Sequence, residues 1–397
     1  MKIRAITLFA ALNFPADPEA LQKLGACATA ARRAYESAGI AVQTLRLALP
    51  GLPDAPDLCA DAVALETAAH AAGFEYVSLG PVETARLPEL PALFAATKGI
   101  FATAHIVHPQ TGAIGGAAIR AAADVIRRCA AIEDGFGNLR FAALANVGPG
   151  TPFFPAAYHD GGATAFAIAT QSADLAVAAC AAARDADDAR LRLAAAITEE
   201  AARLVAVAQE LARTQGLRFG GVDFSLAPFP TAECSIGAAL ETLSGQPLGD
   251  AGTLAAAATL AEAIDQAQFP HAGFCGLMLP VLEDAVLARR AAEGRLRVGE
   301  LLQWSAVCGT GLDTVPIPGD ASEDAIAHLL FDVAALSARL RKPLTARLMP
   351  LPGKGAGDPV HFDFAYFADG GVLPLDGEGG RGLLTETQAL SLHPRKR

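Results

Sequence analysis

The sequence lacks several features that would assign it to a class at once. No stretch of its 397 residues approaches the roughly 18 consecutive apolar residues that a membrane-spanning helix needs. Its formal net charge is −11, and its one basic cluster is the tail HPRKR at 393–397, so it has no basic face for holding nucleic acid. We therefore expect neither a membrane nor a nucleic-acid partner.

The cysteines lack the spacing of a disulfide framework or of a structural zinc site. The seven cysteines are scattered, and none forms a Cys-x-x-Cys pair. Reduced thiols in a cytoplasmic protein explain this pattern better. The start of the chain, MKIRAITLFAALNFPADP, holds only a brief apolar run, which is more typical of a first strand than of a signal peptide. We therefore expect a cytoplasmic location.

Common catalytic and cofactor motifs are also missing. The chain has no Gly-x-Gly-x-x-Gly that opens a helix after a strand, no nucleophile elbow and no His-Glu-x-x-His. The stretch GKGAGD at 353–358 could cradle a phosphate with backbone N–H groups, but no serine or threonine follows its lysine. The sequence therefore identifies no cofactor and leaves a metal site unassigned.

What the chain does have is enough apolar material for a large core. It is 52% hydrophobic and 18% charged, with a mean hydropathy of +0.33, a composition that excludes disorder as the main state. No linker, repeat or break in composition divides it. We therefore expect one domain over residues 1–397, with a short solvated tail from about residue 380.

Strand-like and helix-like runs alternate along the chain, which predicts an α/β fold with a largely parallel sheet. The clearest helices are expected between Asp17 and Gly39, over about 187–215, and from about Ser322 to Pro343, because capping and terminating residues bound these runs. Strands are expected at 3–9, 41–48, 74–79, 99–107, 139–146, 163–170, 218–226, 273–279, 307–315, 344–350 and 360–367.

Polar residues at alternate positions of several strands favour a barrel. In an open sheet with helices on both faces, the central strands should be apolar throughout. Here Asp223 and Ser225 alternate with apolar residues in GGVDFSLAPFP, and Thr103 and His105 do so in GIFATAHIV. Successive side chains of a strand point to opposite faces, so one face would meet helices and the other a polar interior. We expect a barrel with its site inside; solvent-facing edge strands are the alternative.

Several longer segments are similar to those of one bacterial and archaeal family. They are ANVGPGTPFFPAAYHDGG, GGVDFSLAPFP, LPVLED, VCGTGLDTVPIPGD and ARLMPLPGKGAGD. With them the chain resembles the family called domain of unknown function 711, whose members are often labelled pyruvate formate-lyase-like. The resemblance implies a ten-stranded α/β barrel of the glycyl-radical-enzyme type, with an internal finger loop. We expect VCGTGLDTVPIP, which carries Cys308, to form that loop.

The resemblance supplies no reaction, because fold alone does not imply function. Glycyl-radical enzymes keep their glycine in a motif flanked by arginine, valine and tyrosine near the C-terminus. The tail DGEGGRGLLTETQALSLHPRKR has glycines but no such motif. We therefore expect polar rather than radical chemistry.

The resemblance also implies a set of polar site residues. Matched residue by residue, they are Arg4, Arg46, Asn146, His159, Asp223, Ser225, Glu283, Cys308, Asp313 and Arg347. His105 departs from the family pattern, and we expect it to influence the choice of substrate.

The chemistry of these residues suggests roles for them. A loop histidine such as His159 can be a general base or a metal ligand. Asp223 on an inward strand face would need an arginine, a metal or a substrate cation. Cys308 could be a nucleophile if its pKa is lowered. The structural alternatives are a hydrogen-bonded loop histidine, an Asp–Arg pair and an inert buried thiol. With Asp313, these residues form the expected catalytic set.

The arginines predict the charge of the ligand. Arg46 and Arg347 share strand faces with Thr44 and Thr345, and a guanidinium fork binds carboxylate or phosphate in two places. We therefore expect a small anionic metabolite. The expected substrate-binding residues are Arg46, Asn146, Ser225, Glu283, Arg347 and His105.

Three classes of function remain open. The first is an enzyme that acts on the anionic metabolite by acid–base or nucleophilic chemistry. The second is a non-catalytic sensor or binding protein that uses the same pocket. The third is a metal-dependent hydrolase with His159, Asp223 and Asp313 as ligands. The sequence also leaves room for a homo-oligomer.

Overall fold

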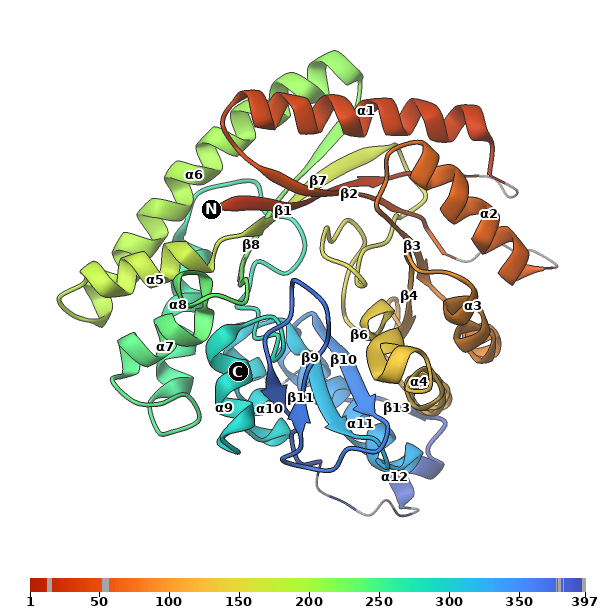
Figure 1. Ribbon diagram of the computed structural model, residues 1–397, viewed down its shortest axis with the longest axis vertical. Coiled ribbons are helices and arrows are strands. Elements are labelled where there is room, and N and C mark those ends of the chain that lie inside the picture. Colours follow the sequence, from red (N-terminus) through yellow and green to blue (C-terminus); the bar gives the residue numbers. More distant parts are fainter. Residues whose placement is uncertain (13–15, 52–56, 376, 378–379, 381, 395–397) are drawn as a thin grey trace.

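The structure is a computed structural model that describes residues 1–12, 16–51, 57–375, 377, 380 and 382–394 (Figure 1). Its centre is a nine-stranded sheet with the strand order β8-β7-β1-β2-β3-β4-β6-β10-β9. The strands of this sheet are β1 (Lys2–Phe9), β2 (Val42–Ala48), β3 (Tyr76–Pro81), β4 (Ile100–His105), β6 (Phe141–Ala145), β7 (Ala165–Gln171), β8 (Arg218–Ala227), β9 (Gly311–Pro318) and β10 (Leu344–Leu351).

Helices surround the curved sheet on its outer side (Figure 1). They are α1 (Pro18–Ser37), α2 (Leu58–Ala71), α3 (Leu90–Ala96), α4 (Gly116–Cys129), α5 (Ala173–Ala182), α6 (Ala186–Gln215), α7 (Ile236–Ser244), α8 (Thr253–Gln266), α9 (Ala285–Ala292), α10 (Val298–Cys308), α11 (Glu323–Leu340) and α12 (Leu383–Glu386). The three helices expected from caps and breakers correspond to α1, α6 and α11. In α1, Asp17 accepts a hydrogen bond from the Glu19 N–H and Pro18 starts the helix, as the sequence indicates.

The sheet is mostly parallel, as predicted, but it contains two groups of strands that run in opposite directions. β1, β2, β3, β4 and β6 are parallel to one another. β7 and β8 form one parallel pair, and β9 and β10 form another. The groups meet in antiparallel pairings of β1 with β7 and of β6 with β10. At each rim of the curved sheet, the first residues of one group of strands therefore lie beside the last residues of the other group.

The alternating pattern separates the two faces of the sheet. In β2, Leu45 and Leu47 are fully buried in the main apolar core. Thr44 and Arg46 of the same strand line an inner cavity. The polar residues at period two therefore do mark an interior face, as the sequence predicts.

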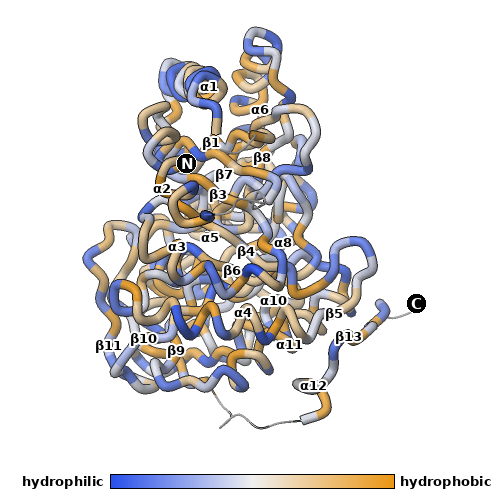
Figure 2. Tube along the Cα trace, turned by 90° about the vertical axis from the view of Figure 1, so that its right-hand side faces the viewer, coloured by the Kyte–Doolittle hydropathy of each residue, from blue (hydrophilic) through white to orange (hydrophobic). Residues whose placement is uncertain are grey.

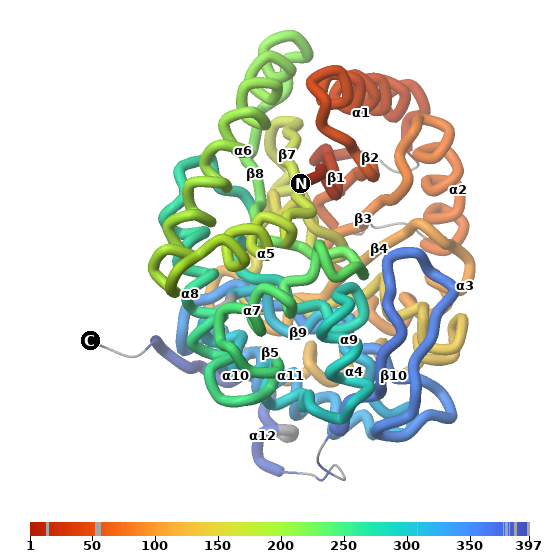
Figure 3. Tube along the Cα trace, turned by 60° about the vertical axis from the view of Figure 1, so that its left-hand side comes forward, coloured from red at the N-terminus to blue at the C-terminus, as the bar shows by residue number. Residues whose placement is uncertain are grey.

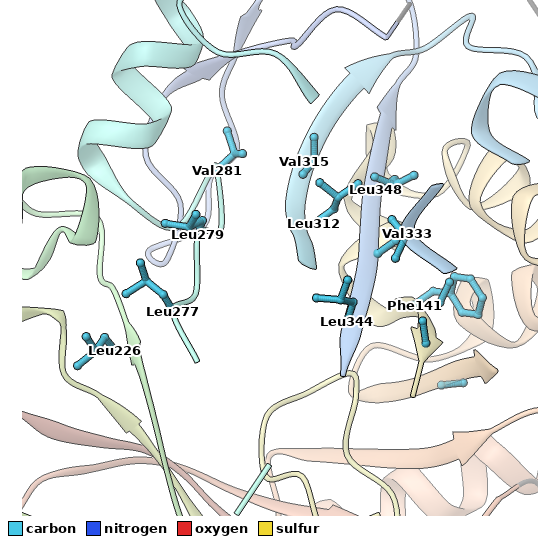
Figure 4. Packing of buried hydrophobic residues seen from close by; sticks show 14 of the residues in the cluster. Phe141, Leu226, Leu277, Leu279, Val281, Leu312, Val315, Val333, Leu344 and Leu348 are labelled. Atoms are coloured by element: carbon cyan, nitrogen blue, oxygen red, sulfur yellow. The ribbon is translucent and has the colours of Figure 1, made fainter. Parts of the chain in front are cut away.

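A closed ten-stranded barrel is not confirmed. β8 and β9 are the two edges of the sheet, and no regular ladder joins them in the part of the chain that the structure describes. The segment predicted as a strand at 273–279 lies between these edges and touches them through isolated bridges. These are Val222 with His271, Leu277 with Gly309, and Pro280 with Asp313. Figure 4 shows Leu277, Leu279 and Val281 of this segment between Leu226 of β8 and Leu312 of β9.

The reason this segment is not a regular strand lies in its backbone donors. The N–H groups of Phe274 and Cys275 donate to the carboxylate of Asp223, at 2.8 and 3.1 Å, instead of to a neighbouring strand. Cys275 also has a φ of 42°, outside the extended region. A regular β-ladder cannot include residues whose N–H groups donate to a side chain and whose backbone is not extended.

The expected finger loop is wrong, and nothing supports the glycyl-radical type. Residues 311–318 form β9, which pairs with β10 from Gly311 opposite Thr345 to Pro318 opposite Leu351. Cys308 is the last residue of α10, and its side chain lies outside the described part of the structure. Gly309 ends that helix with a φ of 105°. A Cβ on Gly311 would lie 2.2 Å from the Thr345 carbonyl oxygen. The glycines therefore serve a helix end and a close strand contact.

Two connecting segments complete the interior. The loop at 146–164 lies inside the curve of the sheet (Figure 1), where Thr7 and Ser78 donate to the carbonyls of Pro152 and Ala157, at 2.8 and 2.7 Å. The residues expected as a strand at 360–367 instead form turns, lying beside α9 and β10 in Figure 3. Short pairings join β11 (Pro359–Val360) with β12 (Gly370–Gly371) and β13 (Ala389–Leu390) with β5 (Ile114–Gly115).

The tail after residue 380 runs along the periphery of the molecule, where Figure 2 shows α12 and β13. There the Gly116 N–H, at the start of α4, donates to the Gln388 carbonyl. No helix in the described residues is long and apolar enough to cross a membrane.

Candidate functional site

A cavity of about 80 Å³ lies on the inner side of the sheet. Its polar wall comes from β1, β2, β9 and β10 and from the segment before α9. Its apolar wall comes from β3, β4, the loop at 146–164 and the turns at 360–367. Its lining includes Arg4, Thr44, Arg46, Tyr76, Phe101, Phe153, Phe154, Met278, Glu283, Asp313, Arg347, Phe364 and Tyr366.

Four of these residues form a buried chain of ion pairs. Glu283 accepts hydrogen bonds from Arg4 through Oε2 and, at 2.8 Å, from Arg347 Nη2 through Oε1. Arg347 Nε also donates to Asp313 Oδ1 at 2.6 Å. The guanidinium of Arg4 lies 5.2 Å from the ring centre of Tyr366. Because each buried carboxylate has an arginine partner, the chain avoids the cost of an isolated buried charge.

Arg46 differs from the other two arginines of the cavity. It is 9% exposed, and its Nε donates to Thr44 Oγ1 at 2.9 Å. Its guanidinium lies 5.6 Å from the ring centre of Tyr76 and 5.1 Å from that of Phe154. No carboxylate among the described residues forms an ion pair with it. Burial, with the charge of Arg4 nearby, lowers the pKa of Arg46 to about 10, so the group still carries its charge at neutral pH.

Arg140 shows how this chain satisfies a buried arginine through its own backbone. Its guanidinium lies 5.2 Å from the Phe94 ring centre, much as Arg46 lies against its two rings. Its Nη atoms, however, donate to the carbonyl oxygens of Thr97 and Phe94, at 2.5 and 2.7 Å. The Nη atoms of Arg46 have no such partners among the described residues. They border the cavity and can donate to a ligand.

Asp313 is the cavity residue best suited to move a proton. Burial raises the pKa of its carboxyl group, Arg347 opposes that shift, and Glu283 adds to it. Arg347 donates to Oδ1, and the Asp313 residue lines the cavity. A buried carboxyl group whose pKa is raised above its usual value is a candidate general acid or base.

Asp223 and Ser225 lie outside the cavity wall, although their strand borders it. Both are fully buried, and Ser225 Oγ donates to Asp223 Oδ1. The remaining donors to this carboxylate are the N–H groups of Phe274 and Cys275. Burial raises the pKa of Asp223 to about 6 against the pull of these hydrogen bonds. The structure thus gives the pair a place in fixing the segment at 271–281.

Three further predicted site residues, His159, Asn146 and His105, also lie apart from the cavity. His159 Nδ1 accepts from the Gly161 N–H at 3.1 Å within its own loop. Asn146 Nδ2 donates to Ser337 Oγ at 2.8 Å. The His105 ring centre lies 5.5 Å from that of Tyr158, and burial lowers the pKa of this histidine to about 4.

The structure therefore brings five predicted site residues to the cavity: Arg4, Arg46, Glu283, Asp313 and Arg347. It does not bring His159, Asp223 and Asp313 together as metal ligands. Within the described part of the chain, no three His, Cys, Asp or Glu side chains are grouped so that they could hold a metal ion.

The sequence did not reveal the aromatic wall of the cavity. Phe101 shares the inward face of β4 with Thr103 and His105, so the same alternation could have identified it. Phe153 and Phe154 lie in a turn-rich loop without periodicity. Their position depends on hydrogen bonds to distant strands, and no local pattern carries that information.

Comparison with known proteins agrees with the resemblance found in the sequence. Residues 1–365 match the model of a protein family described as "Uncharacterised ACR (DUF711)". A UPF0210 protein of Pyrobaculum islandicum is 32% identical over 311 residues, which are 76% of this chain and 68% of that protein. A UPF0210 protein of Methanopyrus kandleri is 30% identical over 79% of this chain and 71% of its own length. Similarity to a UPF0210 protein of Pyrobaculum aerophilum reaches 42% identity over 156 residues, and this match spans only 35% of that relative.

Proposed function

The chain belongs to the DUF711 family, and we propose that it binds a small organic anion in the inner cavity and acts on it by acid–base chemistry. The observation that carries this proposal is Arg46, a buried and charged group with no carboxylate partner among the described residues. A buried charge without a partner is strongly unfavourable. A bound anion would supply the missing partner.

Each part of the cavity would have a distinct role. Arg46 would bind the anion through its two free Nη atoms, held in place by Thr44 and by the two rings beside it. Arg347 would orient Asp313 and oppose the rise of its pKa. Asp313 would then take a proton from the bound molecule or give one to it. The protein itself would supply binding, orientation and the exclusion of water.

A non-catalytic binding protein is the second candidate. It is favoured by the pairing of both cavity carboxylates with arginines. A carboxylate that is held in a salt bridge is a weaker base than a carboxylate without a partner. The two candidates predict the same ligand and differ in whether the ligand is converted.

The first experiment tests the anion contact. Small carboxylates, with benzoate as the probe, are titrated into wild-type protein, Arg46→Met and Arg46→Lys by calorimetry. We expect Arg46→Met to weaken binding by about 2–3 kcal/mol and Arg46→Lys by about 1–2 kcal/mol, since lysine keeps the charge but loses the planar fork.

Arg140→Lys is the matched control, because it alters a buried, ring-stacked arginine that is bound only to its own chain. It should lower stability and leave affinity unchanged. Equal affinity of Arg46→Met and wild type would contradict the proposal. Incubation of each bound ligand with wild type and Asp313→Asn, followed by mass spectrometry, separates the enzyme from the binding protein.

A further inference from the structure

We infer that the ligand of the inner cavity is a monocarboxylate with a flat apolar body, and not a phosphate ester or a dicarboxylate. This inference rests on the proposed function, because it assumes that the cavity holds an organic anion. It adds the charge and the shape of that anion. Two independent features of the wall carry it: the balance of buried charges and the arrangement of aromatic rings.

The charge balance allows one negative charge. Three arginines and two carboxylates line the cavity, so one positive charge is in excess. Glu283 bridges Arg4 and Arg347, and Asp313 binds Arg347. The excess charge is therefore located on Arg46. A single carboxylate would neutralise it and would match the planar guanidinium with two parallel hydrogen bonds.

A second negative charge would be opposed by the wall itself. Glu283 and Asp313 face the same cavity, and the charge of Glu283 reaches Arg46, where it favours the protonated guanidinium. A dianion at Arg46 would therefore meet repulsion from two carboxylates in a poorly solvated space. Glu283 and Asp313 would therefore have two roles: they bind the arginines, and they repel ligands with a second negative charge, such as phosphate esters.

The rings determine the shape of the ligand body. Tyr76 and Phe154 flank the guanidinium, and Phe101 contacts both, with ring centres 5.3 and 5.2 Å away. Phe364 and Tyr366, whose ring centres are 5.2 Å apart, also line the cavity. Aromatic walls favour flat ligands that stack against them or meet them edge to face. The carboxylate of such a ligand would lie at Arg46 and its body against these rings.

The test compares five probes on the intact protein by calorimetry at pH 8. Benzoate has the predicted charge and shape. Phenyl phosphate and phthalate carry a second negative charge, benzyl alcohol is neutral, and acetate lacks the ring. We expect benzoate to bind at least about tenfold more tightly than each of the others, because each of them lacks the charge or the ring or adds a charge that the wall opposes.

Glu283→Gln tests the role of charge directly. The substitution keeps the size of the side chain and raises the excess positive charge by one, so phenyl phosphate should gain affinity relative to benzoate by about tenfold or more. Because Glu283 holds two arginines, a melting curve must first show that the variant folds. If it does not fold, Asp313→Asn changes the charge in the same direction and should shift the ratio of the two affinities the same way.

The outcomes separate this inference from the proposed function. If phenyl phosphate or phthalate binds wild type as tightly as benzoate, the inference fails while the anion site stands. Equal affinity for acetate and benzoate would contradict the inference that the ligand has a flat apolar body. If benzyl alcohol equals benzoate, or if no probe binds, the proposed function fails and this inference fails with it.

Discussion

Asp223 and Arg46 are both charged residues on inward strand faces, but their surroundings give them opposite roles. Three donors of the same chain surround the Asp223 carboxylate: Ser225 Oγ and the N–H groups of Phe274 and Cys275. The Nη atoms of Arg46 have no comparable partners among the described residues. One residue is satisfied within the fold, and the other is available to a ligand.

The sequence identified both residues through the same alternation but could not separate these roles. Two of the three donors to Asp223, the N–H groups of Phe274 and Cys275, lie about 50 positions further along the chain, so no local pattern reports them. The lack of a partner for Arg46 is a property of the folded interior and is equally invisible. Arg347 and Glu283 illustrate the same limit, because the resemblance could indicate that both matter while only the structure shows that they bind each other.

The first prediction follows from Asp223 and concerns the dependence of stability on pH. Its pKa is about 6 in the fold and 3.8 in the reference state, so the folded form holds the proton between pH 4 and 6 when the unfolded form has lost it. The Asp223 contribution to stability must therefore fall as pH rises through this range, by about 3 kcal/mol.

Asp223→Asn removes this titration, so we expect the stability of wild type relative to the variant to decrease from pH 4 to pH 6. Urea unfolding at a series of pH values measures the difference. Ser225→Ala is the control, because it keeps the carboxyl group: loss of a hydrogen bond that lowers the pKa of Asp223 should extend the fall in stability to higher pH and not remove it. A wild-type-minus-Asn difference that stays constant from pH 4 to pH 7 would show that the carboxyl group does not titrate in this range.

At the scale of elements, the strands were largely predictable and one segment was not. All nine strands of the sheet overlap the ranges expected from apolar runs, because such runs persist whatever the tertiary pairing. The segment at 271–281 has the same alternation, with leucines toward the helices and Met278 and Pro280 toward the cavity. Its hydrogen bonds to Asp223 depend on a side chain from a strand about 50 residues earlier in the chain. A closed barrel was therefore expected where the structure has isolated bridges.

The second prediction tests how tightly Asp223 holds this segment. Gly273 has a φ of +67°, and a Cβ there would lie 2.2 Å from Asp223 Oδ2 and 2.9 Å from Pro152 Cδ. Gly112 has nearly the same φ, +70°, with nothing within 4 Å of its Cβ position. Alanine at either position carries the strain of a left-handed backbone, about 1 kcal/mol or more. Alanine at Gly273 also collides with the carboxylate.

We therefore expect Gly273→Ala to lower the free energy of unfolding by at least about 2 kcal/mol more than Gly112→Ala does. Urea denaturation of the two variants provides the comparison, and the shared φ cancels in the difference. Equal losses of stability would mean that the Asp223 carboxylate can move aside, and that it does not fix the segment.

At the scale of the whole molecule, the cavity links distant parts of the chain. Its charged residues extend from Arg4 near the N-terminus to Arg347 in β10, and its aromatic wall extends to Tyr366. They come from both groups of oppositely directed strands. A ligand at Arg46 would touch β2 directly and would reach β9 and β10 through Asp313 and Arg347. Strands of both groups thus line the cavity.

The last prediction follows from this position. A ligand that binds only the folded state stabilises it by about 2.7 kcal/mol at a free concentration one hundred times its dissociation constant. Because the wall joins the two groups of strands, benzoate should slow amide hydrogen exchange in β2 and in β10 together. The C-terminal β13, which pairs with β5 away from the cavity, should be unaffected.

Hydrogen exchange read by mass spectrometry would show all three segments in one experiment, and Arg46→Met should abolish the protection of both strands. Protection confined to β2 would mean that the ligand meets Arg46 without engaging Asp313 and Arg347, and the acid–base role of Asp313 would have to be abandoned.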